Sequence, residues 1–365
     1  MIKYKADWPD AQRRLTALWH GERLTRPCLA VTAPQPVGAP APLPVPAHDE
    51  ARWLDPSYRV AVVRRELEST WWGGEATPSS LLMEGWVICL GGTPHFARET
   101  IWFATQQVDF HRPSPFRHNP NSIWMQKYRV LLLAMCGEAG RDDFMLGSPC
   151  MLPANDLLAM HMGTQEFLLA LLDHPDWMQE AILTGARDQL HAGRAVQALM
   201  RAQGHEYWYG IAGWMPLWAP EPFVPMQSDV SCMLSPAMFD RFVLPELTMV
   251  GEEYGALWYH LDGGDARQHL PRLLSLPFLR VIQYTPAPSE PPNGPAHLEM
   301  YRQIQAAGKI VHLQAPSHNI EPLVRELDPT LLLLYTGCPS RAEGEALLEH
   351  CDRWGQGAPS RKSFR

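Results

Sequence analysis

Short runs of β-forming residues recur along the chain, and segments with helical periodicity separate most of them. These runs lie at residues 28–33, 78–82, 143–147, 207–214, 256–262, 279–284, 309–314 and 330–336. Strands that alternate with helices pair in parallel, because each helix returns the chain to the edge where the previous strand began. Eight such units predict an α/β fold of the (β/α)8 TIM-barrel type.

Prolines and cap residues divide the helical segments from one another. Ser235 followed by Pro236 predicts a helix start, and Pro245 should end or kink that helix. The longest helical region, roughly residues 155–202, should be a pair of helices broken near Pro175. We therefore expect short, well-delimited helices between the strands.

The length of 365 residues allows one large barrel. We expect residues 1–352 to form a single barrel domain, with an N-terminal helix within residues 1–27. Residues 35–141 are irregular, and we expect them to supply extra loops and helices over the barrel mouth. Residues 353–365 are polar and should form a flexible C-terminal tail.

Charge and hydropathy exclude several classes of protein. The formal net charge of −8 argues against nucleic acid as a partner, because phosphate binding needs a basic face. The chain has no apolar run long enough for a membrane span, and its N-terminus lacks the apolar segment of a signal peptide. Seven scattered cysteines without a CxxC pair argue against a disulfide framework. These features predict a cytoplasmic protein with a small-molecule substrate.

Polar residues follow the apolar strands at the edge where barrel enzymes place their chemistry. His260 and Asp262 are two residues apart on one strand, so their side chains should point the same way. Cys338 follows the eighth strand and precedes a helix N-terminus, where the helix dipole favours a thiolate. An imidazole, a carboxylate and a thiolate together predict a zinc site with one position open for substrate.

Each of these residues also has a structural interpretation. A histidine at a strand end is often only hydrogen-bonded, Asp-Gly-Gly is an ordinary turn, and a single cysteine is often buried as a small apolar residue. Asp229, in the loop after the fourth strand, is a candidate proton acceptor, or it caps the helical region that starts at Ser235. The candidate substrate-binding residues are Trp214, Trp218, Tyr259, Gln283, Tyr284 and Gln314.

Several segments resemble the uroporphyrinogen decarboxylase superfamily. They are "RLTALWHGERLTRPCLAVTAP" at 14–34, "NDLLAMHMGTQEFLLALLDHPDWMQEAI" at 155–182, "SDVSCMLSPAMFDRFVLPEL" at 228–247, "YHLDGG" at 259–264 and "YRQIQAAGKIVHLQ" at 301–314. This superfamily includes zinc-dependent methyltransferases that move a methyl group from a corrinoid protein to a thiol. The resemblance covers most of the chain and implies a TIM barrel, with a homodimer as a possible assembly.

In the methyltransferase branch, the zinc motif is His-x-Cys followed far downstream by a second Cys. His260 matches the histidine, Asp262 replaces the first cysteine, and Cys338 matches the second. The resemblance therefore implies zinc as the metal, a methyl-corrinoid as the methyl donor, and a corrinoid protein as the partner that carries it. Aspartate in place of cysteine is still an anionic ligand, but a harder one, so the reactivity of the bound zinc would change.

The decarboxylase branch of the superfamily fits the chain less well. Its substrate needs an arginine-rich cradle and an aspartate near the second strand, but no Lys or Arg lies between Arg26 and Arg52, and no Asp lies between Asp55 and Asp109. The leading hypothesis is a zinc-assisted methyltransferase that acts on a thiol or another small nucleophile. The alternatives are a metal-free, decarboxylase-like lyase that acts on a small carboxylated substrate and a non-catalytic barrel that binds a small molecule.

Overall fold

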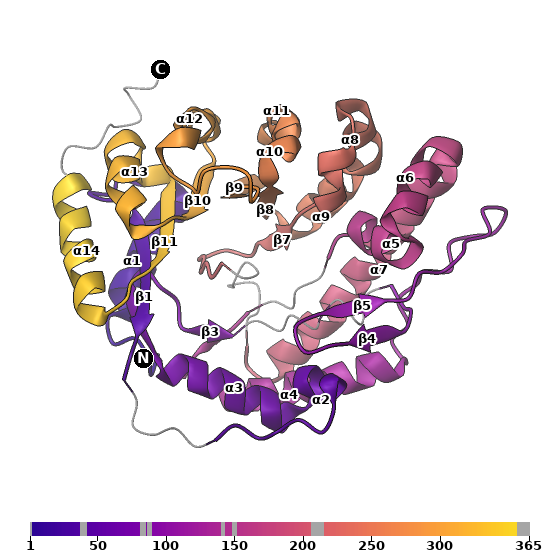
Figure 1. The fold of residues 1–365 in the computed structure, drawn as a ribbon, viewed down its shortest axis with the longest axis horizontal. Coiled ribbons are helices and arrows are strands. Elements are labelled where there is room, and N and C mark those ends of the chain that lie inside the picture. Colours follow the sequence, from indigo (N-terminus) through magenta and orange to yellow (C-terminus); the bar gives the residue numbers. More distant parts are fainter. Residues whose placement is uncertain are drawn as a thin grey trace.

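The computed structural model describes residues 2–36, 42–80, 85, 90–139, 143–147, 152–205 and 215–355. Seven strands form one sheet in the order β2-β1-β11-β10-β9-β8-β7 (Figure 1). Their bounds are Cys28–Pro34 (β1), Thr70–Gly74 (β2), Val224–Met226 (β7), Leu257–Asp262 (β8), Leu279–Thr285 (β9), Ile310–Gln314 (β10) and Leu332–Gly337 (β11). All neighbours in this sheet pair in parallel except β2, which runs antiparallel to β1.

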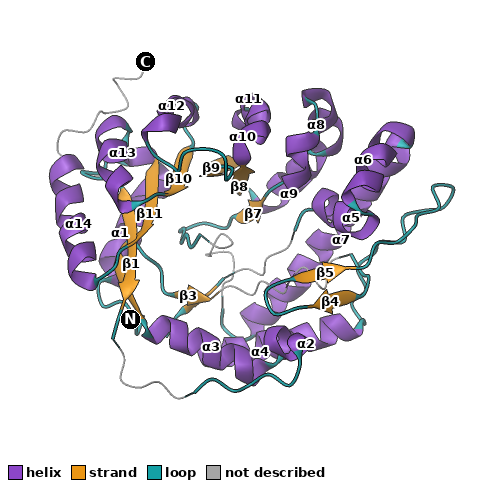
Figure 2. Cartoon of the chain, viewed as in Figure 1, coloured by secondary structure: helices purple, strands orange, loops and turns teal. Residues whose placement is uncertain are grey.

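The α-helices alternate with the strands and lie outside them (Figure 2). They are Trp8–His20 (α1), Asp49–Leu54 (α2), Pro56–Glu68 (α3), Ile123–Ala139 (α4), Ala154–Met162 (α5), Thr164–Asp173 (α6), Pro175–Ala202 (α7), Pro236–Phe242 (α8), Leu244–Tyr254 (α9), Gly263–Ala266 (α10), Leu270–Leu274 (α11), Leu298–Ala306 (α12), Ile320–Glu326 (α13) and Arg341–Gly355 (α14). None of the helices within the described ranges is both long enough and apolar enough to cross a membrane.

The predicted strands agree well with the structure in the C-terminal half of the chain. The runs expected at 28–33, 256–262, 279–284, 309–314 and 330–336 correspond to β1, β8, β9, β10 and β11. The runs at 78–82 and 143–147 correspond to two very short strands, β3 (Ser79–Ser80) and β6 (Met145–Leu146), which pair in parallel with each other. The run at 207–214 lies outside the described residues.

The structure is therefore an α/β protein with a largely parallel sheet and many helices, as predicted. Among the described residues, hydrogen bonds do not join the β3–β6 pair to the seven-stranded sheet. Closure into an eight-stranded barrel consequently stays a prediction.

The predicted helix breaks are confirmed. The Ser235 side chain accepts a hydrogen bond of 3.3 Å from the Met238 amide at the start of α8, and α9 begins with Pro245 in its first turn. Likewise α6 ends at Asp173 and α7 begins at Pro175. In each pair, the proline fits the first turn of the second helix because its missing N–H has no partner there in any case. The region expected as two helices is nevertheless three, because a further break at Gly163, with φ of 88°, separates α5 from α6.

Two expectations about the less regular parts need correction. Residues 35–141 contain α2, α3, α4 and β2, as well as a hairpin of β4 (Pro94–Phe96) and β5 (Ile101–Phe103). The three helices agree with the expectation of extra helices, whereas β2, β4 and β5 were missed because these strands are short and β2 carries two glycines, which are uncommon in strands. At the other end, α14 continues to Gly355 and so includes the first residues of the predicted tail.

Helix α1 closes one end of the sheet. Its apolar residues Leu15, Leu18 and Trp19 belong to a cluster of buried side chains that includes Cys28, Ile310 and other residues at the amino ends of the strands. The left-handed Gly21, with φ of 66°, ends the helix there. The carboxyl ends of the parallel strands remain on the opposite side, where their last side chains can gather.

Candidate metal centre

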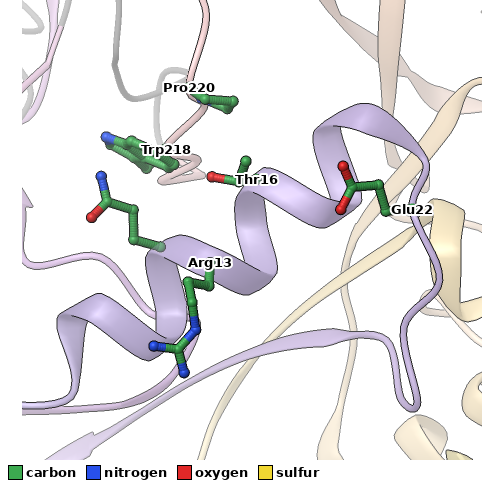
Figure 3. A pocket seen from close by; sticks show the side chains of 6 residues that line it. Arg13, Thr16, Glu22, Trp218 and Pro220 are labelled. Atoms are coloured by element: carbon green, nitrogen blue, oxygen red, sulfur yellow. The ribbon is translucent and has the colours of Figure 1, made fainter.

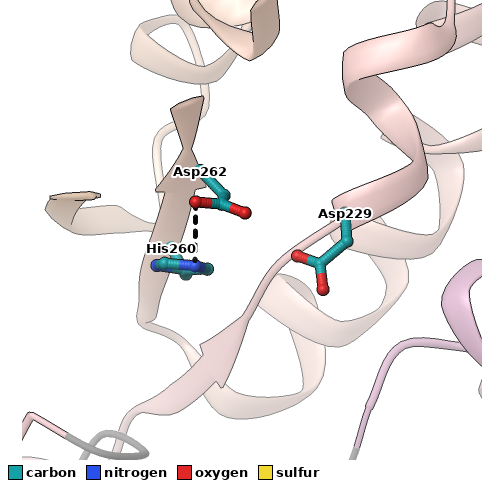
Figure 4. Close-up of side chains that lie close together, drawn as sticks. All are labelled: Asp229, His260 and Asp262. Carbon is teal, nitrogen blue, oxygen red and sulfur yellow. Dashed lines mark ion pairs between the residues drawn. The ribbon is translucent and has the colours of Figure 1, made fainter. Parts of the chain in front are cut away.

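Asp229, His260 and Asp262 come together at the carboxyl end of β8 (Figure 4). Each offers one nitrogen or oxygen atom, and these three atoms all lie within 4.8 Å of one another. His260 and Asp262 share one face of β8, with 4.0 Å between Nε2 and Oδ1. Asp229 is the first residue of η2 (Asp229–Met233), the 3₁₀ helix that follows β7, the neighbour of β8. These three side chains could together hold a metal ion.

Gln283 fixes the orientation of the His260 ring. The two residues are paired between β8 and β9, and His260 Nδ1 is hydrogen-bonded to Gln283 Oε1. The amide nitrogen of Gln283 donates to Thr285 Oγ1 at 2.9 Å, so its oxygen faces the imidazole as an acceptor. An Nδ1 that donates to this oxygen carries the ring proton, and Nε2, which lies 4.0 Å from Asp262 Oδ1, is then the ring atom that could bind a metal. This is the tautomer that a metal-binding histidine needs.

Asp229 is held by polar side chains behind it. Gln227 donates from Nε2 to Asp229 Oδ2 at 2.9 Å, and the buried Asp156 of α5 accepts the Asp229 amide at 3.0 Å. The residue reaches solvent, but the packing around its carboxyl group raises its pKa. The neighbouring Asp262 carboxylate raises this pKa further, whereas His260 opposes the rise. A divalent cation between these groups would relieve the repulsion between the two carboxylates.

Cys338, the third ligand expected from the sequence, does not belong to this group. It follows β11, which is separated from β8 by β9 and β10 in the sheet. The expectation of a thiolate is also reversed: Cys338 is buried, and this burial raises the pKa of its thiol, with a smaller contribution from Glu343. The helix dipole was the only stabilising influence considered from the sequence, and here desolvation outweighs it.

The expected substrate-binding residues are dispersed. Tyr259 and Tyr284 are fully buried in the main apolar core, on the strand face opposite His260 and Asp262. Gln283 is buried beneath His260, whereas Gln314, the last residue of β10, is exposed. Trp214 lies outside the described residues. Of these residues, Gln283 alone contacts the three-ligand group through a described hydrogen bond.

Trp218 lies at a different place. It lines a surface pocket of about 730 Å³ beside α1, together with Gln12, Arg13, Thr16, Glu22 and Pro220 (Figure 3). Its ring packs edge-on against Trp8, with 5.7 Å between the ring centroids. Trp218 therefore belongs to the end of the sheet that α1 covers, and the sequence-based placement beside His260 is not supported.

Comparisons with known proteins give a structural match and no sequence match. No family model matches the chain, and no curated protein matches it in sequence. Among solved structures, a methyltransferase from Methanosarcina mazei matches with a TM-score of 0.57 and 14% identity, over 94% of this chain and 98% of that one. Because the identity is so low, this match establishes a methyltransferase-like fold and not a shared activity. Membership of the uroporphyrinogen decarboxylase superfamily stays a prediction.

Proposed function

We propose that the protein is a metal-assisted methyltransferase in which Asp229, His260 and Asp262 hold a divalent cation. The convergence of these three side chains at the carboxyl end of β8, in a methyltransferase-like fold, is the observation that carries this proposal. The ligand set expected from the sequence is thereby changed: Asp229 takes the place of Cys338. We rank this proposal above the non-catalytic barrel because His260 lies close to two carboxylates.

The donor atoms suit zinc. Zinc binds imidazole nitrogen and carboxylate oxygen, and catalytic zinc sites use three protein ligands and leave a fourth position open. When bound, the metal would supply Lewis acidity that lowers the pKa of a small nucleophile. A set of one nitrogen and two oxygens leaves the metal harder than a thiolate set does, so hydroxyl as well as thiol nucleophiles fit this site.

The protein's own residues would orient the ligands and offset the charge of the bound metal. Gln283 keeps the proton of His260 on Nδ1, and the two carboxylates of Asp229 and Asp262 offset the charge of a divalent cation. The side chain of Asp262 is 51% exposed, so the centre is open to solvent on that side. We propose that the methyl donor approaches from there, and that a corrinoid protein is the partner that carries it.

The metal-free alternative uses the same three residues. The raised pKa of Asp229 brings its carboxylate closer to the strength of a general base, and His260 lies within reach of Asp262 as a second proton carrier. Such a pair could serve a lyase that acts on a small carboxylated substrate. This candidate function is favoured only if the wild-type protein does not bind a metal.

Isothermal titration of the metal-free protein with Zn²⁺ tests the proposal. We expect one equivalent to bind, and His260→Ala to weaken binding by more than about 100-fold, because even the loss of an outer partner costs about 10–100-fold. The matched control is Cys338→Ala, which removes a ligand-type side chain outside the group and should leave the affinity unchanged. A wild-type protein without zinc affinity contradicts the proposal, whereas loss of binding in Cys338→Ala would restore the ligand set expected from the sequence.

A further inference from the structure

Asp156 is a buried carboxylate that points at the segment carrying Asp229. It lies in the first turn of α5 and is 5% exposed. Its two oxygens accept the first two backbone amides of η2, those of Asp229 at 3.0 Å and Val230 at 3.2 Å. The backbone of Asp229 is thus fixed by a side chain that lies more than seventy residues earlier in the sequence.

Gln227 connects Asp156 to the Asp229 side chain as well. Its Nε2 donates to Asp229 Oδ2 at 2.9 Å and lies 3.4 Å from Asp156 Oδ2. One amide group therefore bridges the two carboxylates and separates their charges. The Asp229 backbone is thus held by Asp156 and its carboxylate by Gln227, next to the His260 and Asp262 side chains.

The position of Asp156 is itself fixed by packing at the start of α5. Glu246 of α9 is 1% exposed and accepts the backbone amides of Ala154 at 2.6 Å and Asn155 at 3.3 Å. Asn155 also accepts a hydrogen bond of 3.1 Å from the Ser228 hydroxyl, next to Asp229. Helix α5 and η2 are therefore joined by several buried polar contacts, and Asp156 cannot move away from Asp229 without breaking them.

From these contacts we infer that Asp156 is a positioning residue: through the η2 backbone and Gln227 it holds the Asp229 carboxylate in place as a metal ligand. This inference rests on the proposed function, because it concerns the same centre. Groups that orient ligands from outside a metal site commonly change the metal affinity by about 10–100-fold. Because Asp156 is buried and accepts hydrogen bonds from two amides of η2, we expect an effect of this size on the metal affinity here.

Asp156→Asn tests the inference with little change of shape. The amide keeps one acceptor oxygen but turns its NH₂ group towards a backbone N–H, so one contact to η2 is lost. We expect the zinc dissociation constant to rise about 10-fold or more, and the visible spectrum of bound Co²⁺ to change as its coordination changes. In an Asp229→Ala background, Asp156→Asn should cause no additional loss of affinity, because its effect runs through Asp229.

Asp328→Asn is the matched control. Asp328 is also a buried aspartate at a 3₁₀ helix, η6 (Pro329–Leu331), where it accepts the Thr330 amide at 2.9 Å, but it lies outside the metal group. It should lower thermal stability and leave zinc affinity and the Co²⁺ spectrum unchanged. If Asp156→Asn does not fold, Gln227→Leu removes the bridge alone and should still weaken zinc binding several-fold.

The outcomes separate the two proposals. Wild-type protein that binds zinc, with Asp156→Asn or its substitute Gln227→Leu binding it equally well, overturns the positioning role and leaves the proposed function intact. Wild-type protein that does not bind zinc overturns both. A loss of affinity in Asp156→Asn that persists in the Asp229→Ala background also contradicts the inference, because the effect would then not run through Asp229.

Discussion

The two halves of the chain build the sheet in different ways. From residue 257 onwards, each strand pairs along most of its length and each is followed by a helix: β8, β9, β10 and β11 give a regular parallel sheet. Before residue 148, the described strands other than β1 and β2 are only two or three residues each. Continuous strand pairing therefore defines the C-terminal half, whereas the N-terminal half adds contacts of other kinds to its apolar core.

A buried ion cluster is one such contact. Glu75, just after β2, is 3% exposed and accepts hydrogen bonds from Arg26 Nη1 at 2.8 Å and Arg14 Nε at 2.6 Å. It also accepts the Leu29 amide of β1 at 2.6 Å. Burial alone would raise the pKa of Glu75, but the two guanidinium groups lower it. One carboxylate thus ties the end of β2 to β1 and to the segment that precedes it.

The largest predicted effect follows from removing this carboxylate. Glu75→Ala leaves Arg26 without its buried partner, and breaking a buried pair in this way costs about 3–5 kcal/mol. Urea unfolding should show this loss in the free energy of unfolding. The control is Asp352→Ala, which removes the exposed partner of Arg26 on α14 and should cost at most about 1 kcal/mol. Equal effects of the two substitutions would mean that the cluster does not hold the N-terminal half.

Two glycines, one in each half, should differ in how much their replacement by alanine destabilises the protein. Gly74 ends β2 with φ of 57°, and a Cβ there would lie 2.1 Å from the Leu29 carbonyl oxygen, whereas Gly337 ends β11 with nothing within 4 Å. Gly74→Ala should therefore destabilise the protein by about 2 kcal/mol or more, from backbone strain and the clash. Gly337→Ala should change stability by no more than about 0.5 kcal/mol. A thermal unfolding series on both variants checks this, and a tolerated Gly74→Ala would show that the end of β2 can move.

A pH-dependent effect concerns Glu246 of α9, which accepts backbone amides at the start of α5. Burial raises its pKa to about 7, despite the backbone amides of Ala154 and Asn155 that oppose the rise. The folded protein therefore holds a proton that the unfolded chain releases near pH 4.5, so stability falls as the pH rises from about 4.5 to about 7. We expect Glu246→Gln to reduce this slope by up to about 1 kcal/mol per pH unit.

Chemical denaturation of the metal-free protein at several pH values measures the slope. Asp156, whose pKa burial also raises to about 7, contributes in the same direction and should keep part of the slope in Glu246→Gln. A wild-type stability that is flat between pH 5 and 7 would show that neither carboxyl group is protonated in the folded protein.

The same contrast explains what could be predicted from the sequence. The long apolar runs of β8 to β11 are bounded by turn residues, so their positions follow from pattern alone. In contrast, β2 contains two glycines, and β7 contains Pro225, which a strand tolerates at the edge of a sheet, where β7 lies. These two edge strands give no clear signal before their partners are known.

Within the site, His260 and Asp262 were predictable because alternation along one strand places them together. Cys338 was placed by its position after a predicted strand and by its order in a motif, and neither gives its distance from His260 or the burial of its thiol. Asp156 and Gln227 were missed because their importance lies in contacts between α5 and η2, and no local pattern marks such contacts. Asp156 in particular has the appearance of an ordinary first-turn acidic residue of a helix.

All three donors of the metal group come from β8 and from η2, which follows the neighbouring strand β7. The centre therefore takes its ligands from a single pair of adjacent strands and the segment between them. A change at the end of β11 removes none of these three donors. Related chains could therefore gain or lose a cysteine after β11 in the course of evolution while they keep a working cation site. Their preference for one metal over another could change without any change of fold.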